Sequence, residues 1–365
     1  DCHGLPIENI AEKELGIKRK KEIEEMGVEK FNEFCRSKVL GYVDIWKKII
    51  RRMGRWADME NAYKTMDLDY MESIWWVFKQ LWDKGLIYEG YRSMHVCPRC
   101  ETTLSQSEVA EGYETIKDLS AVVKFKLEPG QKIGNFTTDE NTYILAWTTT
   151  PWTLIGNAAL AVRKDIEYLV LRAMGDFAHI KEGEKIIIAK KLEVFFNVFG
   201  EDHQTIGPVG KINISTAFKT SRDEQYNIET KQPVKGKDLV GLKYKPLFDY
   251  YSKDEKLENR ENGWKIYAAD FVTTEEGTGV VHIAPAFGDD DMNLGKKENL
   301  PFIQHVNMDG TIKPEAGEFA GMNVKPADDP QKTDVEIIKY LAHHDLLFSK
   351  EKYEHSYPHC WRCET

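Results

Sequence analysis

Two short cysteine motifs, far apart in the chain, most constrain its fold. Both read C-x-R-C-E-T, and 259 residues separate the first pair of cysteines from the second. Two C-x-x-C pairs supply four thiolates, the tetrahedral ligand set that suits structural zinc. Because ordinary zinc ribbons space their pairs by about 15–20 residues, one shared ion would require the intervening chain to leave and return to the same place. This arrangement is typical of an inserted domain whose base is clamped by a metal. The predicted ligands are Cys97, Cys100, Cys360 and Cys363.

Other uses of these cysteines remain possible at this stage. Disulfides are one alternative, and a redox role for either C-x-x-C pair is another. The isolated Cys2 and Cys35 and the lack of a signal peptide before the first charges favour a reducing, cytoplasmic location. A repeated motif is also unusual for a redox pair. We therefore expect zinc in a structural role.

Composition excludes several classes of protein. The 365 residues are 41% hydrophobic and 30% charged, which is too apolar for disorder, and no run approaches the roughly 20 apolar residues of a membrane span. The net charge of −10 argues against a general nucleic-acid binder. Charge is uneven, however: residues 17–56 hold 12 Lys/Arg and 6 Asp/Glu, a net of +6. One helical face there is either solvated or in contact with RNA phosphates; it carries Lys48, Arg51, Arg52 and Arg55.

Periodicity divides the chain into a helical part and a β-rich part. The first 90 or so residues are mainly helical in pattern, and Asp69 with Glu72 resembles a capping box. The helix that follows is expected to bury an aromatic stripe of Ile74, Trp75, Phe78, Leu81 and Trp82. From about residue 118 to 350 the pattern predicts a β-rich, barrel-like α+β domain. Its expected strands are Ala121–Leu127, Thr142–Thr148, Asn157–Val162, Tyr168–Arg172, Lys185–Ala189, Trp264–Val272 and Gly279–Ala284.

Few helices are expected within the β-rich part. The patterns predict one near Lys190–Val198, one that starts near Asp289, and one over Thr333–Leu347. Thr333 and Glu336 suggest a capping box for the last of these.

Two polar motifs within the β-rich part could carry chemistry. Trp147–Thr153 offers four hydroxyls in six residues, which either line a polar pocket or reflect β-propensity and turn chemistry. Gly277–Pro285 is a glycine turn, a strand and a proline stop, and the acids Asp289–Asp291 follow it. Acids at a helix start complement its dipole, but one could hold a substrate ammonium. His282 either positions a hydroxyl or water, or is a satisfied core residue.

No motif supports covalent catalysis or common nucleotide binding. The chain has no nucleophile elbow, and neither a P-loop nor a G-x-G-x-x-G motif opens a helix after a strand.

Together these motifs resemble the isoleucyl-tRNA synthetases, which are class I aminoacyl-tRNA synthetases. The opening D-C-H-G-L-P-I-E resembles a segment of the family's catalytic Rossmann domain, and Tyr70–Trp76 with the first cysteine motif resembles the approach to its inserted editing domain. Thr148–Leu154 with Gly156-Asn157, Gly236–Pro246 and Gly277–Asp291 resemble the editing domain itself. The resemblance covers roughly 250 residues, and about 165–232 lie outside it.

The resemblance implies four segments. Residues 1–92 would be part of the class I Rossmann-type catalytic domain, and 93–117 the first zinc knuckle and connector. Residues 118–350 would be the editing domain of the valyl, isoleucyl and leucyl type. Residues 351–365 would be the second knuckle and the return to the catalytic domain.

The resemblance also implies residue roles. Thr148, Thr149 and Thr150 would line the pocket for the misacylated amino acid and the terminal adenosine of tRNA. Asp291 would fix the substrate's ammonium group, and His282 would lie beside the aminoacyl group. We group these five as catalytic. Asp1 would bind the isoleucine ammonium in the synthetic site, and we add Trp147 and Trp152 as substrate-binding residues.

The implied activity is attachment of isoleucine to tRNA(Ile) with ATP and Mg²⁺, with hydrolysis of misacylated valyl-tRNA(Ile) by the editing region. The family's H-x-G-H and K-M-S-K-S motifs are not in this sequence, so we expect a piece of a longer, monomeric enzyme that could edit but not activate isoleucine. One alternative is the editing region of a valyl- or leucyl-type synthetase, although those carry T-T-R-P where Thr148–Pro151 stands. Another is a non-catalytic, zinc-stapled RNA-binding module.

Overall fold

The computed structural model describes residues 2, 4–173, 176, 179–190, 229–230, 233–275, 277–326, 328–363 and 365. The chain forms two compact units. Unit 1 comprises Asp1–Tyr91, Val96–Thr103 and Cys360–Thr365, and unit 2 comprises Arg92–His95 and Leu104–His359. No helix in the described part of the chain is long and apolar enough to cross a membrane.

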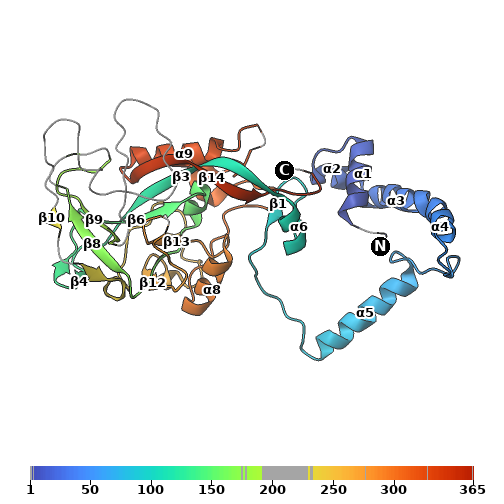
Figure 1. Ribbon diagram of the computed structural model, residues 1–365, viewed down its shortest axis with the longest axis horizontal. Helices are drawn as coiled ribbons and strands as arrows, with labels where there is room; N and C mark the ends of the chain where they lie inside the picture. The colour runs from blue at the N-terminus through green and yellow to red at the C-terminus, as the bar shows by residue number, and fades with distance from the viewer. Residues whose placement is uncertain are drawn as a thin grey trace. The chain divides into compact units, whose positions relative to one another are not determined.

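Unit 1 is built mainly from helices (Figure 1). Gly16, with a φ of 72°, ends the first helix in the left-handed conformation that glycine adopts without strain. Ala11, Ile23 and Phe31 form a small core between the first three helices. The helices are α1 (Leu5–Leu15), α2 (Lys20–Met26), α3 (Val28–Val39), the 3₁₀ turn Leu40–Tyr42, α4 (Val43–Arg52) and α5 (Leu68–Asp83).

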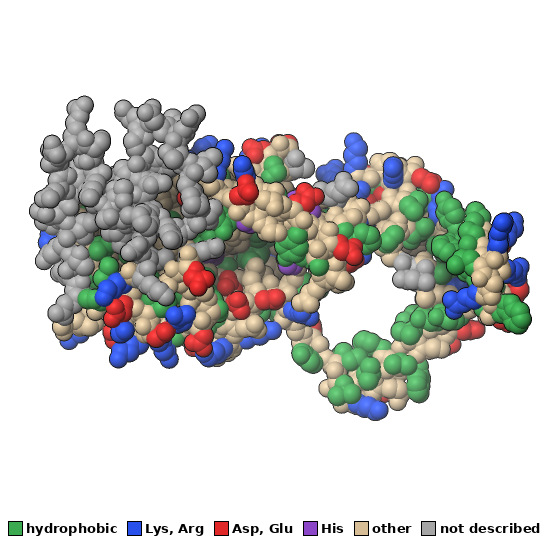
Figure 2. Space-filling model, in the orientation of Figure 1, with side chains coloured by type: hydrophobic (Ala, Val, Ile, Leu, Met, Phe, Trp, Pro, Cys, Tyr) green, Lys and Arg blue, Asp and Glu red, His purple; other side chains and the backbone are tan. Residues whose placement is uncertain are grey.

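Helix α5 differs from its prediction in two ways. Its N-cap is Asp67, whose side chain makes no capping bond, so the predicted capping box of Asp69 and Glu72 is wrong. None of its residues is buried, and the predicted aromatic core is therefore wrong as well: Trp75 and Trp82 are 60% and 58% exposed. Figure 2 shows hydrophobic side chains on the surface of this helix. The spacing of apolar residues predicted the helix correctly but contained no information about what covers its apolar side chains.

Unit 2 is an α+β unit around one mixed sheet. Its large sheet runs in the order β10-β8-β9-β6-β13-β7-β12, while β11 pairs with β8 and β3 joins β6 to β14. The strands of this sheet are β3 (Tyr113–Lys126), β6 (Thr142–Thr148), β7 (Ala159–Val162), β8 (Glu167–Arg172), β9 (Lys185–Ala189), β10 (Glu229–Thr230), β11 (Val234–Lys235), β12 (Ile266–Ala268), β13 (Val281–Ile283) and β14 (Leu347–Pro358).

Short elements complete unit 2. A separate hairpin pairs β4 (Lys132–Ile133) with β5 (Phe136–Thr137). The helices are α6 (Gln106–Glu111), α8 (Asp289–Glu298) and α9 (Lys332–His343), and the 3₁₀ turns are Pro151–Gly156, Gly236–Asp238, Arg260–Asn262 and Pro314–Phe319.

Strand β6 is the centre of the sheet. It pairs antiparallel with β3 along its length, parallel with β9 over Thr142–Ile144, and parallel with β13 at Trp147. Because β9 and β13 share one edge of β6, the sheet divides beside the end of β6. The motif that begins at Trp147 therefore leaves the sheet where two strands separate.

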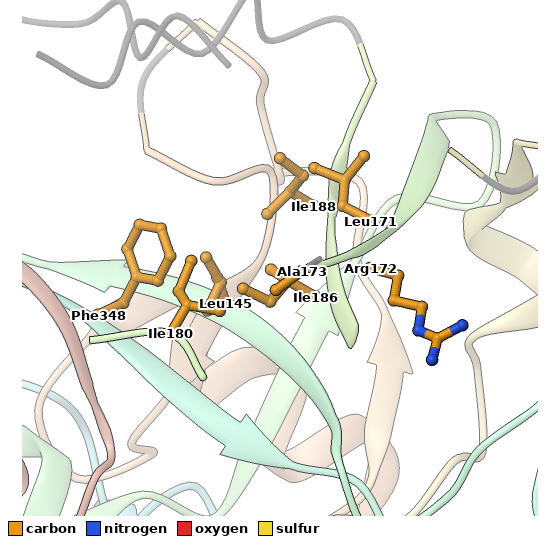
Figure 3. A pocket seen from close by; sticks show the side chains of 8 residues that line it. All are labelled: Leu145, Leu171, Arg172, Ala173, Ile180, Ile186, Ile188 and Phe348. Carbon is orange, nitrogen blue, oxygen red and sulfur yellow. The ribbon is translucent and has the colours of Figure 1, made fainter. Parts of the chain in front are cut away.

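The core of unit 2 is apolar and closely packed. Phe125, Ile144, Leu160 and Ile187 are completely buried within it. One small cavity of about 10 Å³ remains, which is room for at most about one water molecule. Figure 3 shows that its wall is made of aliphatic and aromatic side chains, from which the guanidinium of Arg172 points away. We interpret this cavity as a packing defect of the core, because the described side chains that line it are apolar apart from that of Arg172.

Each predicted strand has a counterpart in the structure, but the bounds often differ, and only Ile266–Ala268 of the predicted Trp264–Val272 is a strand. The short strands β4, β5, β10 and β11 were not predicted. β6 and β9 have the predicted bounds, whereas β3 starts eight residues before the predicted Ala121. Strand β14 was not predicted, and it pairs with β3 over eleven residue pairs (Figure 1). Most side chains of β14 after Phe348 are polar, and none of them is buried, so the apolar alternation that signals a strand is missing there.

Two of the three helices predicted in the β-rich part are confirmed. A helix does begin at Asp289, and another covers most of Thr333–Leu347. The capping box of Thr333 and Glu336 is wrong, since the Thr333 hydroxyl instead donates to the Asn323 carbonyl, 2.6 Å away. The helix predicted near Lys190–Val198 lies outside the described residues.

Candidate functional site

The first candidate site is a group of four cysteines in unit 1. All four sulfur atoms lie within 4.8 Å of one another. The Sγ of Cys363 is 3.5 Å from that of Cys97 and 3.7 Å from that of Cys100, close to the roughly 3.8 Å that a tetrahedral zinc–thiolate site requires. None of the six cysteines forms a disulfide. Cys97, Cys100, Cys360 and Cys363 therefore lie close enough together to hold a metal ion.

A charged network ties this group to the helices of unit 1. Arg99 lies between the first two cysteines, in the turn between β1 (Val96–Cys97) and β2 (Thr102–Thr103). Its Nη1 is 3.3 Å from Glu12 Oε2 and 4.0 Å from Cys100 Sγ. Glu12 is buried in α1 and also pairs with Lys20 at 2.8 Å. Arg99 thus places a positive charge between a buried carboxylate and a thiol, where it would stabilise the thiolate form.

The second candidate site begins with the threonine loop, residues 148–153, that follows β6. The Thr148 hydroxyl oxygen accepts a bond from the backbone N–H of Thr150, 3.1 Å away. The Thr153 hydroxyl donates to the Thr150 carbonyl at 2.8 Å and lies 3.2 Å from the Thr150 hydroxyl. Pro151 starts a 3₁₀ turn there, because its fixed φ suits the first helical position. The turn folds three of the four hydroxyls toward one another.

A glycine turn brings the next segment against this loop. Gly277 and Gly279 have φ values of 70° and 71°. Residues other than glycine rarely adopt this backbone conformation. A Cβ on Gly279 would lie 2.4 Å from Ala189 Cβ, and one on Gly277 would lie 3.2 Å from the ring of Trp147. Both the backbone conformation and the close approach therefore require glycine. After the turn, β13 pairs with the end of β6 at Trp147.

His282, in the middle of β13, is buried among polar partners. Its Nε2 lies 2.9 Å from the Thr153 hydroxyl oxygen, and its Nδ1 lies 3.4 Å from Asn157 Nδ2. Burial lowers the pKa of His282 to about 4. The imidazole is therefore neutral at pH 7, and both of its nitrogens are engaged within the protein.

Asp291 reaches the same region from the first turn of α8. Its Oδ2 accepts a bond from the backbone N–H of Ala284, 2.8 Å away. Burial raises the pKa of Asp291 to about 6, and the negative charge of Asp290 adds to the effect, while the bond from Ala284 opposes it. The carboxyl group is mostly ionised at pH 7, yet its charge is poorly solvated, which favours pairing with a cation.

These segments surround one open pocket of about 310 Å³. The structure places the five residues predicted to be catalytic around it: Thr148, Thr149, Thr150, His282 and Asp291. Trp147 also lines the pocket, as do Phe271, Thr273, Thr278 and Val280. The volume is within the range of small-molecule pockets, and hydroxyls and one carboxylate converge on it.

Trp152 does not line this pocket, and Asp1 lies outside the described residues. The Trp152 ring packs edge-on against Phe287, with ring centroids 5.1 Å apart. Its backbone N–H donates to Asp334 Oδ1 at 3.0 Å, and its carbonyl oxygen lies 3.0 Å from His305 Nε2. Both polar groups of its backbone are thus held by buried side chains, and Trp152 anchors the threonine loop.

The carboxylate that holds Trp152 belongs to a buried ionic network. Asp334 Oδ2 lies 3.0 Å from Lys325 Nζ, which also contacts Asp118 Oδ2 at 2.6 Å. Burial raises the pKa of Asp334 to about 6, although Lys325 opposes this effect. The network joins α9 and β3 to the threonine loop.

Several of these residues gave no signal in the sequence. Asp334 and His305 lie more than 150 positions from Trp152, and their residue types carry no motif. Phe271 lies in an irregular segment after β12 that the sequence predicted to continue the strand, and Thr273 follows it; no motif singled out either residue. Asn157 and Tyr244, in contrast, fall within segments that resemble the family.

Comparison with known proteins identifies the family. A family model described as tRNA synthetases class I (I, L, M and V) matches residues 1–344. The chain belongs to the class I tRNA synthetases. Within this family it is 41% identical to the isoleucine–tRNA ligase of Clostridium acetobutylicum over 365 residues, and 43% identical to that of Treponema denticola over 380.

The match covers the whole chain but only part of these relatives. The chain spans 30% of the length of the first ligase and 32% of the second. Among solved structures, the editing domain of the P. falciparum cytosolic leucyl-tRNA synthetase matches 63% of the chain and 98% of its own length, with 10% identity and a TM-score of 0.37. At that score a shared fold is not established.

Proposed function

We propose that the pocket of unit 2 hydrolyses misacylated tRNA, specifically valyl-tRNA(Ile). The observation that carries this proposal is the convergence of Thr148, Thr149, Thr150, His282 and Asp291 on one pocket. Identity of about 40% to isoleucine–tRNA ligases supports the choice of tRNA. In segment terms, residues 118–350 would be the editing domain and 1–92 part of the catalytic domain.

Hydrolysis of an aminoacyl ester requires few catalytic groups from the protein. An aminoacyl ester is already activated, so hydrolysis needs a positioned water and a fixed substrate but no protein nucleophile. Asp291, ionised above its pKa of about 6, would hold the α-ammonium group. The threonine hydroxyls would orient the water and the ribose of the terminal adenosine. The ring of Trp147 would face the apolar side chain of the substrate.

Binding energies explain why such an activity is useful. Isoleucine and valine differ by one methylene, which a hydrophobic pocket distinguishes by only about 1–3 kcal/mol, a limit for which isoleucyl-tRNA synthetase is itself the standard example. A second pocket that hydrolyses the smaller product removes the errors that the first selection lets through. We propose that the complete protein attaches isoleucine to tRNA(Ile) with ATP and Mg²⁺, using parts of the enzyme beyond this pocket.

Zinc is the metal that best fits the four cysteines. Four thiolates in a tetrahedral arrangement suit zinc and leave no open coordination position, so the ion would have a structural role. Cys97, Cys100 and Cys360 are buried, and the Cys100 N–H lies 3.3 Å from Cys97 Sγ as a stabilising donor. Metal analysis of the full chain under reducing conditions should find one zinc per chain, and absence of bound metal would refute the site.

A deacylation assay with matched substrates tests the proposed function. The full chain should release valine from valyl-tRNA(Ile) faster than it releases isoleucine from isoleucyl-tRNA(Ile). Equal binding of both tRNAs without hydrolysis would favour the alternative, a non-catalytic RNA-binding module. Preference for threonyl-tRNA(Val) or for misacylated tRNA(Leu) would instead point to a valyl- or leucyl-type editing site.

A further inference from the structure

The orientation of the Asn157 side chain is fixed by a backbone carbonyl. Asn157 Nδ2 lies 2.9 Å from the Ala159 carbonyl oxygen, which can only accept. The amide nitrogen must therefore face Ala159, and the amide oxygen must face the Tyr244 hydroxyl, which donates to it at 2.6 Å. The second hydrogen of the amide nitrogen then points at His282 Nδ1, 3.4 Å away. That nitrogen must accept, so it carries no proton.

The other side of the imidazole leads to the same conclusion independently. Thr153 has a single hydroxyl hydrogen, which it donates to the Thr150 carbonyl at 2.8 Å. At its 2.9 Å contact with His282 Nε2 the Thr153 oxygen must therefore accept. His282 Nε2 must then carry the proton. Two backbone carbonyls, those of Ala159 and Thr150, thus require the same tautomer.

All members of this chain of hydrogen bonds are buried. Tyr244 is 1% exposed, and Asn157, Thr153 and His282 are 4%, 5% and 8% exposed. Water therefore cannot easily replace a missing partner, and a buried polar group without one is costly. Reversal of any single bond would leave a donor facing a donor or an acceptor facing an acceptor.

We propose that Tyr244, through Asn157, holds His282 as the neutral Nε2–H tautomer, and that His282 acts as a positioning residue for the threonine loop. Its Nε2–H group fixes Thr153, which fixes Thr150. His282 exchanges no proton with the substrate, because both nitrogens are occupied within the protein. Orientation of the attacking water is left to the threonine hydroxyls and to Asp291. The positioning role rests on the proposed deacylation; the tautomer does not.

Nitrogen NMR of the full chain, labelled with ¹⁵N-histidine, tests the tautomer directly. We expect Nε2 of His282 to give a protonated, pyrrole-type signal and Nδ1 an unprotonated, pyridine-type signal. The His282→Gln variant identifies these signals by their loss. A protonated Nδ1 in the unmodified chain would overturn the proposal.

Two substitutions test the relay to His282. Asn157→Asp replaces the amide donor by an acceptor of the same shape, and we expect His282 Nδ1 to become protonated. Tyr244→Phe removes the hydroxyl that orients the amide, and we expect mixed tautomers and a kcat for deacylation about tenfold lower, with KM changed less than about twofold. Unchanged His282 signals in both variants would contradict the relay.

Tyr168→Phe is the matched control for Tyr244→Phe. Tyr168 is also fully buried, and its hydroxyl donates to the Gly279 carbonyl at 2.7 Å, outside the relay. A similar loss of stability is expected, but with unchanged His282 nitrogen signals. A shift of these signals equal to that in Tyr244→Phe would mean that general packing sets the tautomer. If the unmodified chain shows the expected tautomer without deacylating valyl-tRNA(Ile), the proposed function fails and the tautomer stands.

Discussion

The two units of this chain use their apolar and polar residues in opposite ways. In unit 2 the strand residues Ile144, Leu160 and Ile187 are completely buried, and the polar residues beside the pocket are bonded to one another. In unit 1 the tryptophans and Phe78 of α5 are more than half exposed. Besides a small core of Ala11, Ile23 and Phe31, the described residues of unit 1 form ion pairs and a group of four cysteines. The contrast shows that apolar periodicity defines a face, whereas burial depends on partners that periodicity does not encode.

Removal of the metal should give the largest difference between the two units, because only unit 1 contains the four cysteines. Structural zinc contributes about 10–16 kcal/mol in small zinc-binding peptides, and four thiols without a metal cannot replace that energy. After treatment with a chelator, we expect much faster amide hydrogen exchange at residues 96–103 and 360–363, and little change in β6 and β13. Equal acceleration in β6 would show that the units depend on one metal-dependent core.

The buried network behind the threonine loop should give the next largest effect. Asp334→Ala leaves Lys325 buried beside Asp118 alone and frees the Trp152 N–H, so we expect a loss of about 3–5 kcal/mol in the free energy of unfolding. Urea denaturation measures it. Asp329→Ala, a substitution of an exposed acid just before the same helix, is the control and should cost less than about 1 kcal/mol. Equal effects would remove the network from the account.

The ionised Asp291 carboxylate should lower the free energy of unfolding, although the proposed function requires it. Because its folded pKa of about 6 exceeds the ordinary 3.8, the folded chain holds its proton more tightly, and this group's contribution to stability falls as the pH rises from about 4 to 6. Asp291→Asn should therefore raise the free energy of unfolding by up to about 3 kcal/mol at pH 8, with little effect at pH 4. Destabilisation at pH 8 would show that the carboxylate has a stabilising partner stronger than the Ala284 N–H.

The same pKa predicts how hydrolysis depends on pH. If the ionised carboxylate binds the substrate ammonium, kcat/KM for valyl-tRNA(Ile) should be highest near pH 7, because the substrate's α-amino group loses its proton above about pH 8. This ratio should fall about tenfold for each pH unit below 6. A pH profile of the full chain checks this expectation, and a flat profile down to pH 5 would contradict it.

The exposed face of α5 should give the smallest effect. Trp76 is 64% exposed, and surface substitutions of this kind usually change stability by no more than about 0.5 kcal/mol. Trp76→Ser should therefore leave the free energy of unfolding of the full chain nearly unchanged. A loss above about 2 kcal/mol would mean that the face is buried in solution and that the contrast between the units is weaker than described.

The sequence predicted the functional motifs better than the tertiary contacts that hold them in place. The two C-x-R-C-E-T motifs indicated that cysteines 259 residues apart could share a metal, because four thiolates need one another to form such a site. The strand β6 was also predicted correctly, since most of its residues are β-branched or aromatic. Strand β14 was missed because its residues after Phe348 are mostly polar and show no apolar alternation.

Long-range polar partners could not be predicted from the sequence. Asp334 was expected only as a residue in the first turn of a helix, yet its carboxylate accepts from Trp152, 182 positions away. The Thr333 hydroxyl was expected to cap that helix, but it bonds to the Asn323 carbonyl. In both cases the side chain bonds to a residue outside its own helix, and such a partner cannot be predicted from the local sequence pattern.

The rate of valyl-tRNA(Ile) hydrolysis by two neighbouring variants tests the central claim most directly. Asp291→Asn and Asp290→Asn each remove one negative charge from the first turn of α8, but Asp291 lines the pocket and Asp290 is exposed. The account predicts that Asp291→Asn slows hydrolysis by about 100-fold or more, while Asp290→Asn stays within about twofold of the unmodified chain. Equal rates for the two variants would contradict the claim that this pocket is an editing site.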